Sequence, residues 1–219
     1  MERKRSNQSY EAFPMNGGDG QYSYAQNSNH QRTGADTTKH IAKEVILEIL
    51  DLETLLQDTS KVFHIADLGC SVGPNTFFTV QNIIDAVNLT FQSQTHSTID
   101  SSLELQVFFD DHVGNDFNSR FNSLPDDKQY HATAMPGSVY GRLFPESSIH
   151  IFNSSYALHW LSNVPKEIVA KNSHAYDKGK IYFTSEVDKE VAEAYSAQFA
   201  RNIESFLNFR ALELVPGGI

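Results

Sequence analysis

Residues 62–75, which read VFHIADLGCSVGPN, restrict the fold more than any other part of the sequence. An apolar run ends at Asp67, a turn containing Gly69 and Gly73 follows, and a second apolar segment with a helical period begins near Asn75. This order of strand, tight loop and helix is typical of the crevice in which open α/β sheets bind nucleotides. The glycines give the loop backbone conformations that other residues disfavour, and they let a ligand approach the main chain closely.

The spacing of this loop favours a cofactor without phosphates. It is D-x-G-x-x-x-G, whereas dinucleotide-binding enzymes have G-x-G-x-x-G, so a pyrophosphate would have one glycine fewer to lie against. The carboxylate of Asp67 at the strand end suits a cationic amino group. S-adenosylmethionine, which carries an ammonium and a sulfonium, therefore fits this loop better than NAD, and an NAD-dependent enzyme is the disfavoured alternative.

Composition and charge exclude several classes of partner. The 219 residues, 40% of them apolar, are enough for one sizeable domain with a packed core, or for one domain and part of another. A formal net charge of −10 without a long basic cluster argues against a nucleic-acid partner. No apolar run approaches the roughly 18 residues of a membrane span, and the first residues lack the apolar core of a secretory signal. With a single cysteine, which fits a reducing compartment, we expect a cytoplasmic protein without a membrane partner.

Hydrophobic periodicity predicts an alternation of strands and helices, and hence an α/β fold. Residues 1–13 are polar, and we expect them to be flexible. Helices are expected at residues 37–56, with Thr37 or Thr38 as cap, 75–91 and 189–214, and strands or extended segments at 62–67, 103–109, 130–135, 148–152 and 180–184. In this alternation the turn at 216–218 should lead into another strand, whereas the sequence stops at Ile219.

Acidic residues follow the first two predicted strands. Asp67 could cap a helix or face water, but its place before a glycine turn at the carboxyl end of a strand favours ligand binding. Asp110 and Asp111 could be a solvated pair. A ribose hydroxyl acceptor is the usual role of a carboxylate at that strand end, and we favour this role for one of the two.

The segment 153–160, NSSYALHW, holds the only tryptophan of the chain beside a histidine and a tyrosine. A core aromatic patch is the ordinary interpretation of such a cluster. Indole and imidazole N–H groups are also polar donors on apolar bodies, which suits them to orient a carboxylate in an apolar pocket. Cys70, beside the glycine loop, has no evident base to activate it, and we expect it to pack against the backbone.

An ordered series of short motifs runs from Met15 to Gly218. It comprises MNGGDG at 15–20, SYA at 23–25, NS at 27–28, ADLGCS at 66–71, GPNT at 73–76, GNDFN at 114–118, PGS at 136–138, YGRLFP at 140–145, SSY at 154–156, LHWLS at 158–162, VPKEI at 164–168 and KGK at 178–180. This series closely resembles the plant SABATH methyltransferases. These enzymes methylate the carboxylates of salicylate, jasmonate, indole-acetate, gibberellin or farnesoate, and the ring nitrogens of xanthine alkaloids.

The resemblance implies a Rossmann-like class I methyltransferase sheet with helices on both faces and the strand order 3-2-1-4-5-7-6. Residues 14–219 resemble only the N-terminal part of the family's domain, with the first four strands. We therefore expect a fold that is incomplete at its C-terminus and lacks most of the helical cap. The implied partner is a small carboxylic acid, and a homodimer is left open.

The implied function is S-adenosylmethionine-dependent methyl transfer to the carboxylate of a small plant metabolite or hormone, which forms a methyl ester. No catalytic acid or base is expected, because a carboxylate is already ionised at neutral pH and catalysis then rests on alignment. The alternative is a catalytically inactive truncated fragment that at most binds cofactor or pairs with a full-length relative.

Position by position, the resemblance also implies the site residues. The cofactor site would comprise Tyr24, Asp67, Cys70, Asn75, Asp111, His112, Ser138, Val139, Asn153, Ser154 and Ser155. The substrate site would comprise Ser28, Gln31, Tyr156, His159 and Trp160, of which Gln31, His159 and Trp160 would hold the acceptor carboxylate. Within these sets Asp67 would support the methionine end of the cofactor and Asp111 its ribose, and residues 153–156 would form the wall between cofactor and acceptor.

Three positions differ from the family's usual pattern. His112 stands where the family usually has Leu, and Val139 where it usually has Phe; both positions flank the adenine, so we expect altered packing of the nucleoside. Asp177 stands where the family often has an Asn assigned to a magnesium site, which makes Mg²⁺ a second implied cofactor.

Overall fold

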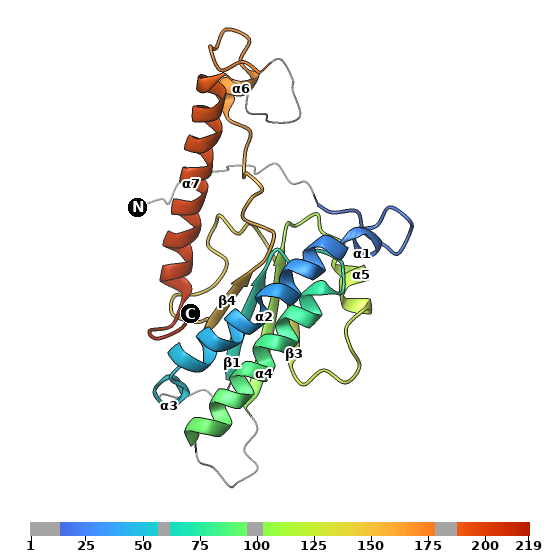
Figure 1. Ribbon diagram of the computed structural model, residues 1–219, viewed down its shortest axis with the longest axis vertical. Coiled ribbons are helices and arrows are strands. Elements are labelled where there is room, and N and C mark those ends of the chain that lie inside the picture. Colours follow the sequence, from blue (N-terminus) through green and yellow to red (C-terminus); the bar gives the residue numbers. More distant parts are fainter. Residues whose placement is uncertain (1–13, 57–61, 96–102, 178–187) are drawn as a thin grey trace, which may run out of the picture.

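The computed structural model describes residues 14–56, 62–95, 103–177 and 188–219. Two predicted features, the flexible segment 1–13 and the extended segment 180–184, lie outside the described residues. Within the described ranges the chain forms a parallel β-sheet with helices on both sides (Figure 1). No helix in these ranges is both long enough and apolar enough to cross a membrane.

The sheet has four strands in the order β3-β2-β1-β4. Its strands are β1 (Val62–Leu68), β2 (Glu104–Asp111), β3 (His131–Pro136) and β4 (Ile151–Ser154). All neighbouring strands pair in parallel, which confirms the order 3-2-1-4 expected for the first four strands. Because parallel strands end at the same edge, Leu68 pairs with both Asp110 and Ser154 there. The predicted ligand residues of three strands are thereby brought to one edge of the sheet.

Seven helices are seen in the described part of the chain. They are α1 (Tyr24–Asn27), α2 (Asn29–Ile49), α3 (Leu52–Leu55), α4 (Asn75–Thr95), α5 (Phe117–Asn122), α6 (Lys166–Val169) and α7 (Lys189–Glu213). Helices α2 and α4 run side by side over one face of the sheet, and α7 lies apart from them beyond β4 (Figure 1).

The predicted start of the first long helix was wrong, because α2 begins at Asn29 and not at Thr37. The hydroxyls of Thr37 and Thr38 do not cap a helix; they donate to carbonyls one turn earlier, at 2.8 Å from Thr33 and 3.1 Å from Gly34. Threonine can bond the backbone in this way within a helix as well as at its start. The first half of α2 is polar and largely exposed, so it lacks the apolar period from which the start was predicted.

The strand predicted at 148–152 was also wrong at its start, since β4 begins at Ile151. Ser148 and Ile149 instead donate their backbone N–H groups to the carbonyl of Glu213, and Ile149 forms an isolated parallel bridge with Leu214. The end of α7 thus takes up backbone groups that would otherwise extend β4.

Alternating residues of β1 face two separate clusters of the core. Phe63 and Ile65 pack with side chains of α2 and α4, among them Ile46 and Ile84. On the other side, Leu68 and Ala66 pack with a second cluster that includes Phe144, Ile149 and, from α7, Phe206. Both faces of the sheet are therefore covered at the strand ends, where the glycine loop begins.

His150 supplies a test of this packing through pH. Its Nδ1 accepts a hydrogen bond of 3.0 Å from the backbone N–H of His64, and burial, with the nearby His64 ring, lowers its pKa from 6.5 to about 4. The unfolded chain therefore binds a proton at a higher pH than the folded chain does. This contribution to stability is complete above pH 6.5 and is lost as the pH falls toward 4.

The variant His150→Asn keeps a hydrogen-bond acceptor but does not titrate in this range. We expect acidification from neutral pH to about pH 5 to lower the melting temperature of the original chain more than that of the variant. Melting curves at the two pH values measure the difference. An equal drop in both proteins would mean that His150 is protonated in the folded state.

Candidate functional site

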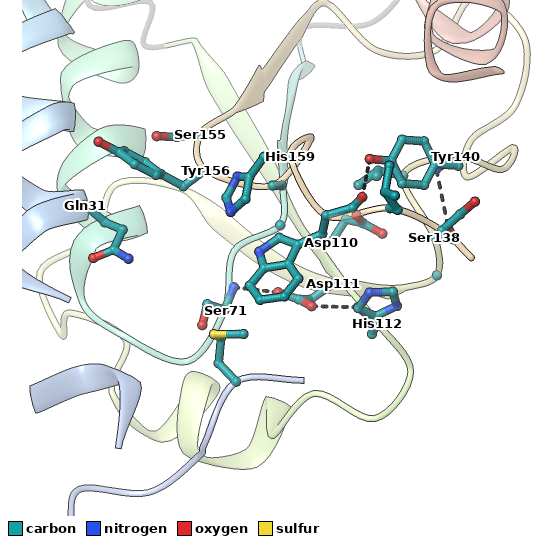
Figure 2. Close-up of a pocket in the computed structure, with 18 of the residues that line it drawn as sticks. Gln31, Ser71, Asp110, Asp111, His112, Ser138, Tyr140, Ser155, Tyr156 and His159 are labelled. Carbon is teal, nitrogen blue, oxygen red and sulfur yellow. Dashed lines mark hydrogen bonds between the residues drawn. The ribbon is translucent and has the colours of Figure 1, made fainter. Parts of the chain in front are cut away.

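A cavity opens at the carboxyl edge of the sheet, where β1 and β2 end (Figure 2). Many of the predicted site residues line it: Tyr24, Gln31, Asp111, His112, Ser138, Val139, Ser155, Tyr156, His159 and Trp160. Residues predicted for the cofactor and residues predicted for the acceptor thus share one cavity.

The turn after β1 forms the part of the wall nearest the sheet. Gly69 has φ +83° and Ser71 has φ 53°, and the N–H groups of Gly69 and Cys70 both donate to the carbonyl of Asp110 at 2.9 Å. A side chain on Gly69 would collide with the Cβ of Ala157. Glycine is therefore required here both for its backbone conformation and for its close contact with the segment after β4.

Asp111 is the carboxylate that the structure holds most firmly against the cavity. One of its oxygens accepts from the N–H of Ser71 at 2.6 Å and the other from the N–H of His112 at 2.7 Å (Figure 2). Burial raises the pKa of Asp111, whereas these two donors act in the opposite direction. Each carboxylate oxygen has a second lone pair, so the group can still accept hydrogen bonds from ligand hydroxyls.

Asp67 lies behind the turn and is not part of the cavity wall. It is buried, and its two oxygens accept from the hydroxyl of Thr76 and, at 2.6 Å, from the amide of Asn153. Burial also raises its pKa. Asp67 thus ties the end of β1 to α4 and to β4, and its direct contact with a cofactor stays a prediction.

A buried cation that sequence reasoning missed supports the same turn. The side chain of Arg120, on α5, is 0% exposed and donates to the carbonyl of Gly73 at 2.7 Å. Its guanidinium lies 4.0 Å and 4.7 Å from the ring centres of Phe77 and Phe109. Its positive charge attracts the acidic residues around the turn. No pattern in the sequence distinguishes this arginine from an exposed one.

The opposite wall of the cavity is built by α2 and the segment after β4. Tyr156 has φ 57°, and its phenol occupies space that a side chain on Gly34 of α2 would fill. The ring of His159 lies 6.5 Å from that of Tyr156 and 5.4 Å from that of Trp160. Gln31 of α2 faces the same space (Figure 2), and its buried Oε1 has no hydrogen-bond partner in the part of the chain that the structure describes. Amide, imidazole and indole groups, all hydrogen-bond donors, are thus gathered on an aromatic wall.

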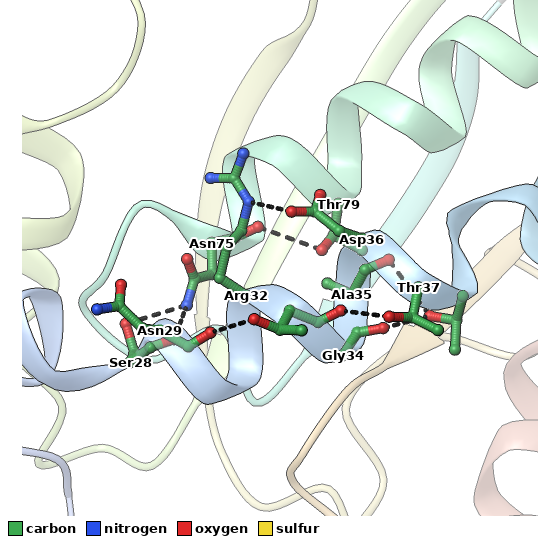
Figure 3. A network of polar contacts seen from close by, with 11 residues as sticks. Ser28, Asn29, Arg32, Gly34, Ala35, Asp36, Thr37, Asn75 and Thr79 are labelled. Carbon is green, nitrogen blue, oxygen red and sulfur yellow. Dashed lines mark hydrogen bonds and ion pairs between the residues drawn. The ribbon is translucent and has the colours of Figure 1, made fainter.

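Several predicted site residues lie outside the cavity wall. They stabilise the elements that form it. Asn75 donates from its amide to the carbonyl and to the hydroxyl of Ser28, both at 3.0 Å, which fastens α4 to the start of α2 (Figure 3). The hydroxyl of Ser154 donates to the carbonyl of Leu68 at 3.2 Å. Cys70 is buried, and burial raises its pKa well above the usual value, so it stays a thiol. Ligand contacts by these residues stay predictions.

The structure adds residues that the sequence analysis did not assign. Asp110, which was weighed against Asp111, is fully buried at the cavity, and neither of its oxygens has a hydrogen-bond partner among the described residues. Tyr140 lines the cavity too; it begins the motif YGRLFP at 140–145, to which the sequence analysis assigned no role. Among the described residues, no three His, Cys, Asp or Glu side chains are grouped to hold a metal ion, and the role of Asp177 stays a prediction.

Helix α7 fastens the segment that runs along this cavity. Arg210 donates to the carbonyl of Gly141 at 2.9 Å and of Val139 at 3.3 Å. Glu213 accepts from the N–H groups of Leu143 at 2.5 Å and Phe144 at 2.9 Å. Two side chains of one helix therefore fix the backbone of residues 139–144 beside the cavity.

Comparison with known proteins points to one family. The family described as SAM dependent carboxyl methyltransferase matches residues 10–219. Loganic acid O-methyltransferase of Catharanthus roseus is 50% identical over 210 residues, which cover 95% of this chain and 55% of that protein. Farnesoic acid carboxyl-O-methyltransferase of Arabidopsis thaliana is 41% identical over 208 residues, which cover 95% of this chain and 57% of that protein.

A solved structure agrees with these relatives. It is described as loganic acid methyltransferase with SAH, and it matches with a TM-score of 0.87 and 50% sequence identity. The match covers 94% of this chain and 56% of that one. The chain therefore spans little more than half the length of the relatives that it matches.

Proposed function

Because the chain belongs to the family of S-adenosylmethionine-dependent carboxyl methyltransferases, we propose that its cavity binds S-adenosylmethionine beside a small carboxylic acid and promotes formation of the methyl ester. The observation that carries the proposal is a cavity that joins a fixed carboxylate, Asp111, to an aromatic wall with hydrogen-bond donors. The relatives named for loganic and farnesoic acid support an organic acid as acceptor.

The residues on the sheet side of the cavity fit the cofactor. Asp111 has free acceptor capacity for the two hydroxyls of a ribose. Gly137 lies on the same side, and because a side chain there would collide with Leu143, the backbone of this part of the wall packs closely against that residue. When bound, S-adenosylmethionine supplies a methyl group on a positively charged sulfur.

The residues on the aromatic side fit an acid. His159, Gln31 and Trp160 offer N–H donors to a carboxylate, and the rings around them exclude water that would otherwise shield it. A carboxylate is ionised at neutral pH, so the chain needs no general base to activate it. The task of these residues is then to hold the oxygen in line, which is where most of the rate gain of such a reaction lies.

A titration and an assay test the proposal. We expect S-adenosylhomocysteine, the demethylated product, to bind saturably in calorimetry, and NADH not to bind. We also expect transfer of labelled methyl from S-adenosylmethionine to loganic or farnesoic acid. Absence of S-adenosylhomocysteine binding would overturn the whole proposal. Binding without transfer would overturn its catalytic part and leave the alternative of a fragment that only binds cofactor.

Trp160 should matter more for the acid than for the cofactor. It lies on the cavity with 49% of its surface exposed, next to His159. We expect Trp160→Ala to lower kcat/KM for the acid by about tenfold to a hundredfold, the usual range for an altered apolar pocket. The Kd for S-adenosylhomocysteine should change much less.

Phe199 gives a matched control for that substitution, because it is an aromatic residue with 45% exposure on α7, away from the cavity wall. Phe199→Ala should leave both constants as they are. Equal losses of acid use and cofactor affinity in Trp160→Ala would contradict its assignment to the acceptor.

Three further parts of the proposal rest on the sequence alone. A magnesium site at Asp177, a homodimer and a cytoplasmic location without nucleic-acid or membrane partners stay predictions. Of these, magnesium has the most direct test: addition of Mg²⁺ should raise the melting temperature of the original chain and not that of Asp177→Ala.

A further inference from the structure

Two segments form neighbouring parts of the cavity wall. We call residues 137–144 the cofactor-side segment, because it carries Ser138 and Val139, and residues 157–162 the acceptor-side segment, because it carries His159 and Trp160. The two segments come from different loops of the chain. Methyl transfer requires the cofactor and the acid to keep their relative positions, because a displacement of about 1 Å between the reacting groups can lower the rate a hundredfold.

The hydroxyl of Tyr140 joins these two segments directly. It donates to the carbonyl oxygen of Trp160 at 2.6 Å, and the carbonyl oxygen of Leu158 lies at 3.1 Å as a second acceptor. These two carbonyls stand on either side of His159 in the chain. A single side chain of the cofactor-side segment thus holds the backbone on both sides of His159, which is predicted to bind the acceptor.

Helix α7 holds the same segments from behind. Ser205 donates from its hydroxyl to the carbonyl of Tyr140 at 2.9 Å. The hydroxyl of Ser162, in the acceptor-side segment, donates to the amide oxygen of Asn202 at 2.8 Å. Tyr140 is only 5% exposed, so water cannot easily replace the hydrogen bonds of its hydroxyl. The backbone of Tyr140 is fixed by α7, and its hydroxyl transmits that fixed position to the acceptor side.

We propose that Tyr140 is a positioning residue, whose hydroxyl sets the placement of His159 and Trp160 relative to the cofactor. This inference rests on the proposed function for the identity of the two ligands. Its structural content is independent of that function, since it requires only that loss of one hydroxyl loosens the acceptor-side segment while the cofactor-side segment stays in place.

The test compares two tyrosine-to-phenylalanine variants of the full 219-residue chain. Tyr140→Phe removes the hydroxyl and keeps the ring. Tyr130→Phe is the matched control, because Tyr130 is also buried, at 7% exposure, lies outside the cavity wall, and has a hydroxyl without a hydrogen-bond partner within the described ranges. Trp160 is the only tryptophan of the chain, so its fluorescence reports on the acceptor-side segment alone.

We expect acrylamide to quench Trp160 more strongly in Tyr140→Phe than in the original chain. A hydrogen bond of ordinary net strength shifts a local equilibrium about fivefold. Since Trp160 is already 49% exposed, the quenching constant can rise by up to about twofold. Tyr130→Phe should give the quenching constant of the original chain. The Kd for S-adenosylhomocysteine should be alike in all three proteins, because Arg210 and Glu213 still hold the cofactor-side segment.

Unchanged quenching in Tyr140→Phe, or an equal rise in Tyr130→Phe, would overturn the proposal. So would a loss of S-adenosylhomocysteine affinity in Tyr140→Phe without a change in quenching. If the original chain does not bind S-adenosylhomocysteine, the proposed function fails, and the quenching comparison still decides the role of Tyr140. Ser205→Ala offers a second variant, which should raise quenching by loosening Tyr140 from α7.

Discussion

Glu213→Ala is expected to lower the free energy of unfolding by about 3–5 kcal/mol, because it leaves a buried arginine without its charge partner. The side chains of Arg210 and Glu213 are 7% and 0% exposed, and Nη2 of the arginine lies 2.7 Å from Oε2 of the glutamate. The other carboxylate oxygen accepts from the backbone of Leu143 and Phe144, so these N–H groups would lose their partner too. Urea denaturation, read from the transition midpoint at constant slope, measures the loss.

The same helix supplies a matched control. Lys189 and Glu193 form an ion pair of 3.5 Å between side chains that are 83% and 64% exposed. Glu193→Ala should cost less than about 0.5 kcal/mol, as exposed pairs on helices do. Glu213→Gln should fall between the two, since it keeps an oxygen acceptor but not the charge. Similar midpoints for Glu213→Ala and Glu193→Ala would show that the buried pair contributes no more than an exposed one.

Gly69→Ala is the second change with a large expected effect, a loss of about 2–5 kcal/mol from backbone strain and overpacking together. Gly69 has φ +83°, and the new methyl group would meet the Cβ of Ala157, a neighbour with no flexible side chain to move away. Relief of the collision would move the turn away from the acceptor-side segment. We therefore also expect weaker binding of S-adenosylhomocysteine in calorimetry.

Gly18 separates the two causes of that loss. It has a similar φ of +71°, but a side chain there would meet nothing within 4 Å. Gly18→Ala should cost only the strain of the left-handed conformation, about 1–2 kcal/mol. If Gly69→Ala is no more destabilising than Gly18→Ala in the same denaturation experiment, the turn is not packed against Ala157 as described.

Local patterns were sufficient to predict the part of the fold nearest the site. We predicted β1, the glycine turn and the helix from Asn75 because each depends on a pattern of residues that are close together in the sequence. The order of the four strands came from the family resemblance, and the sheet confirms it. The start of α2 was missed because its first turns are polar and carry no apolar period.

The supports of the site could not be predicted because they join distant parts of the chain. Asp67 was identified at the strand end, but its partner Asn153 lies on another strand, 86 residues away. Arg120 and Arg210 were missed because arginines are seldom buried, and nothing in an isolated helix pattern marks the exceptions. The burial of such a charge can be recognised only from the packing of the helices and strands around it.

The fastening of both cavity segments to α7 has a consequence for synthesis. Strands β1–β4 leave the ribosome before α7 does, so a nascent chain can pair its sheet while Tyr140 and Ser162 still lack Ser205 and Asn202. A small molecule that needs the closed cavity therefore cannot guide the early steps of folding. Its stabilising effect begins only once the helix has docked.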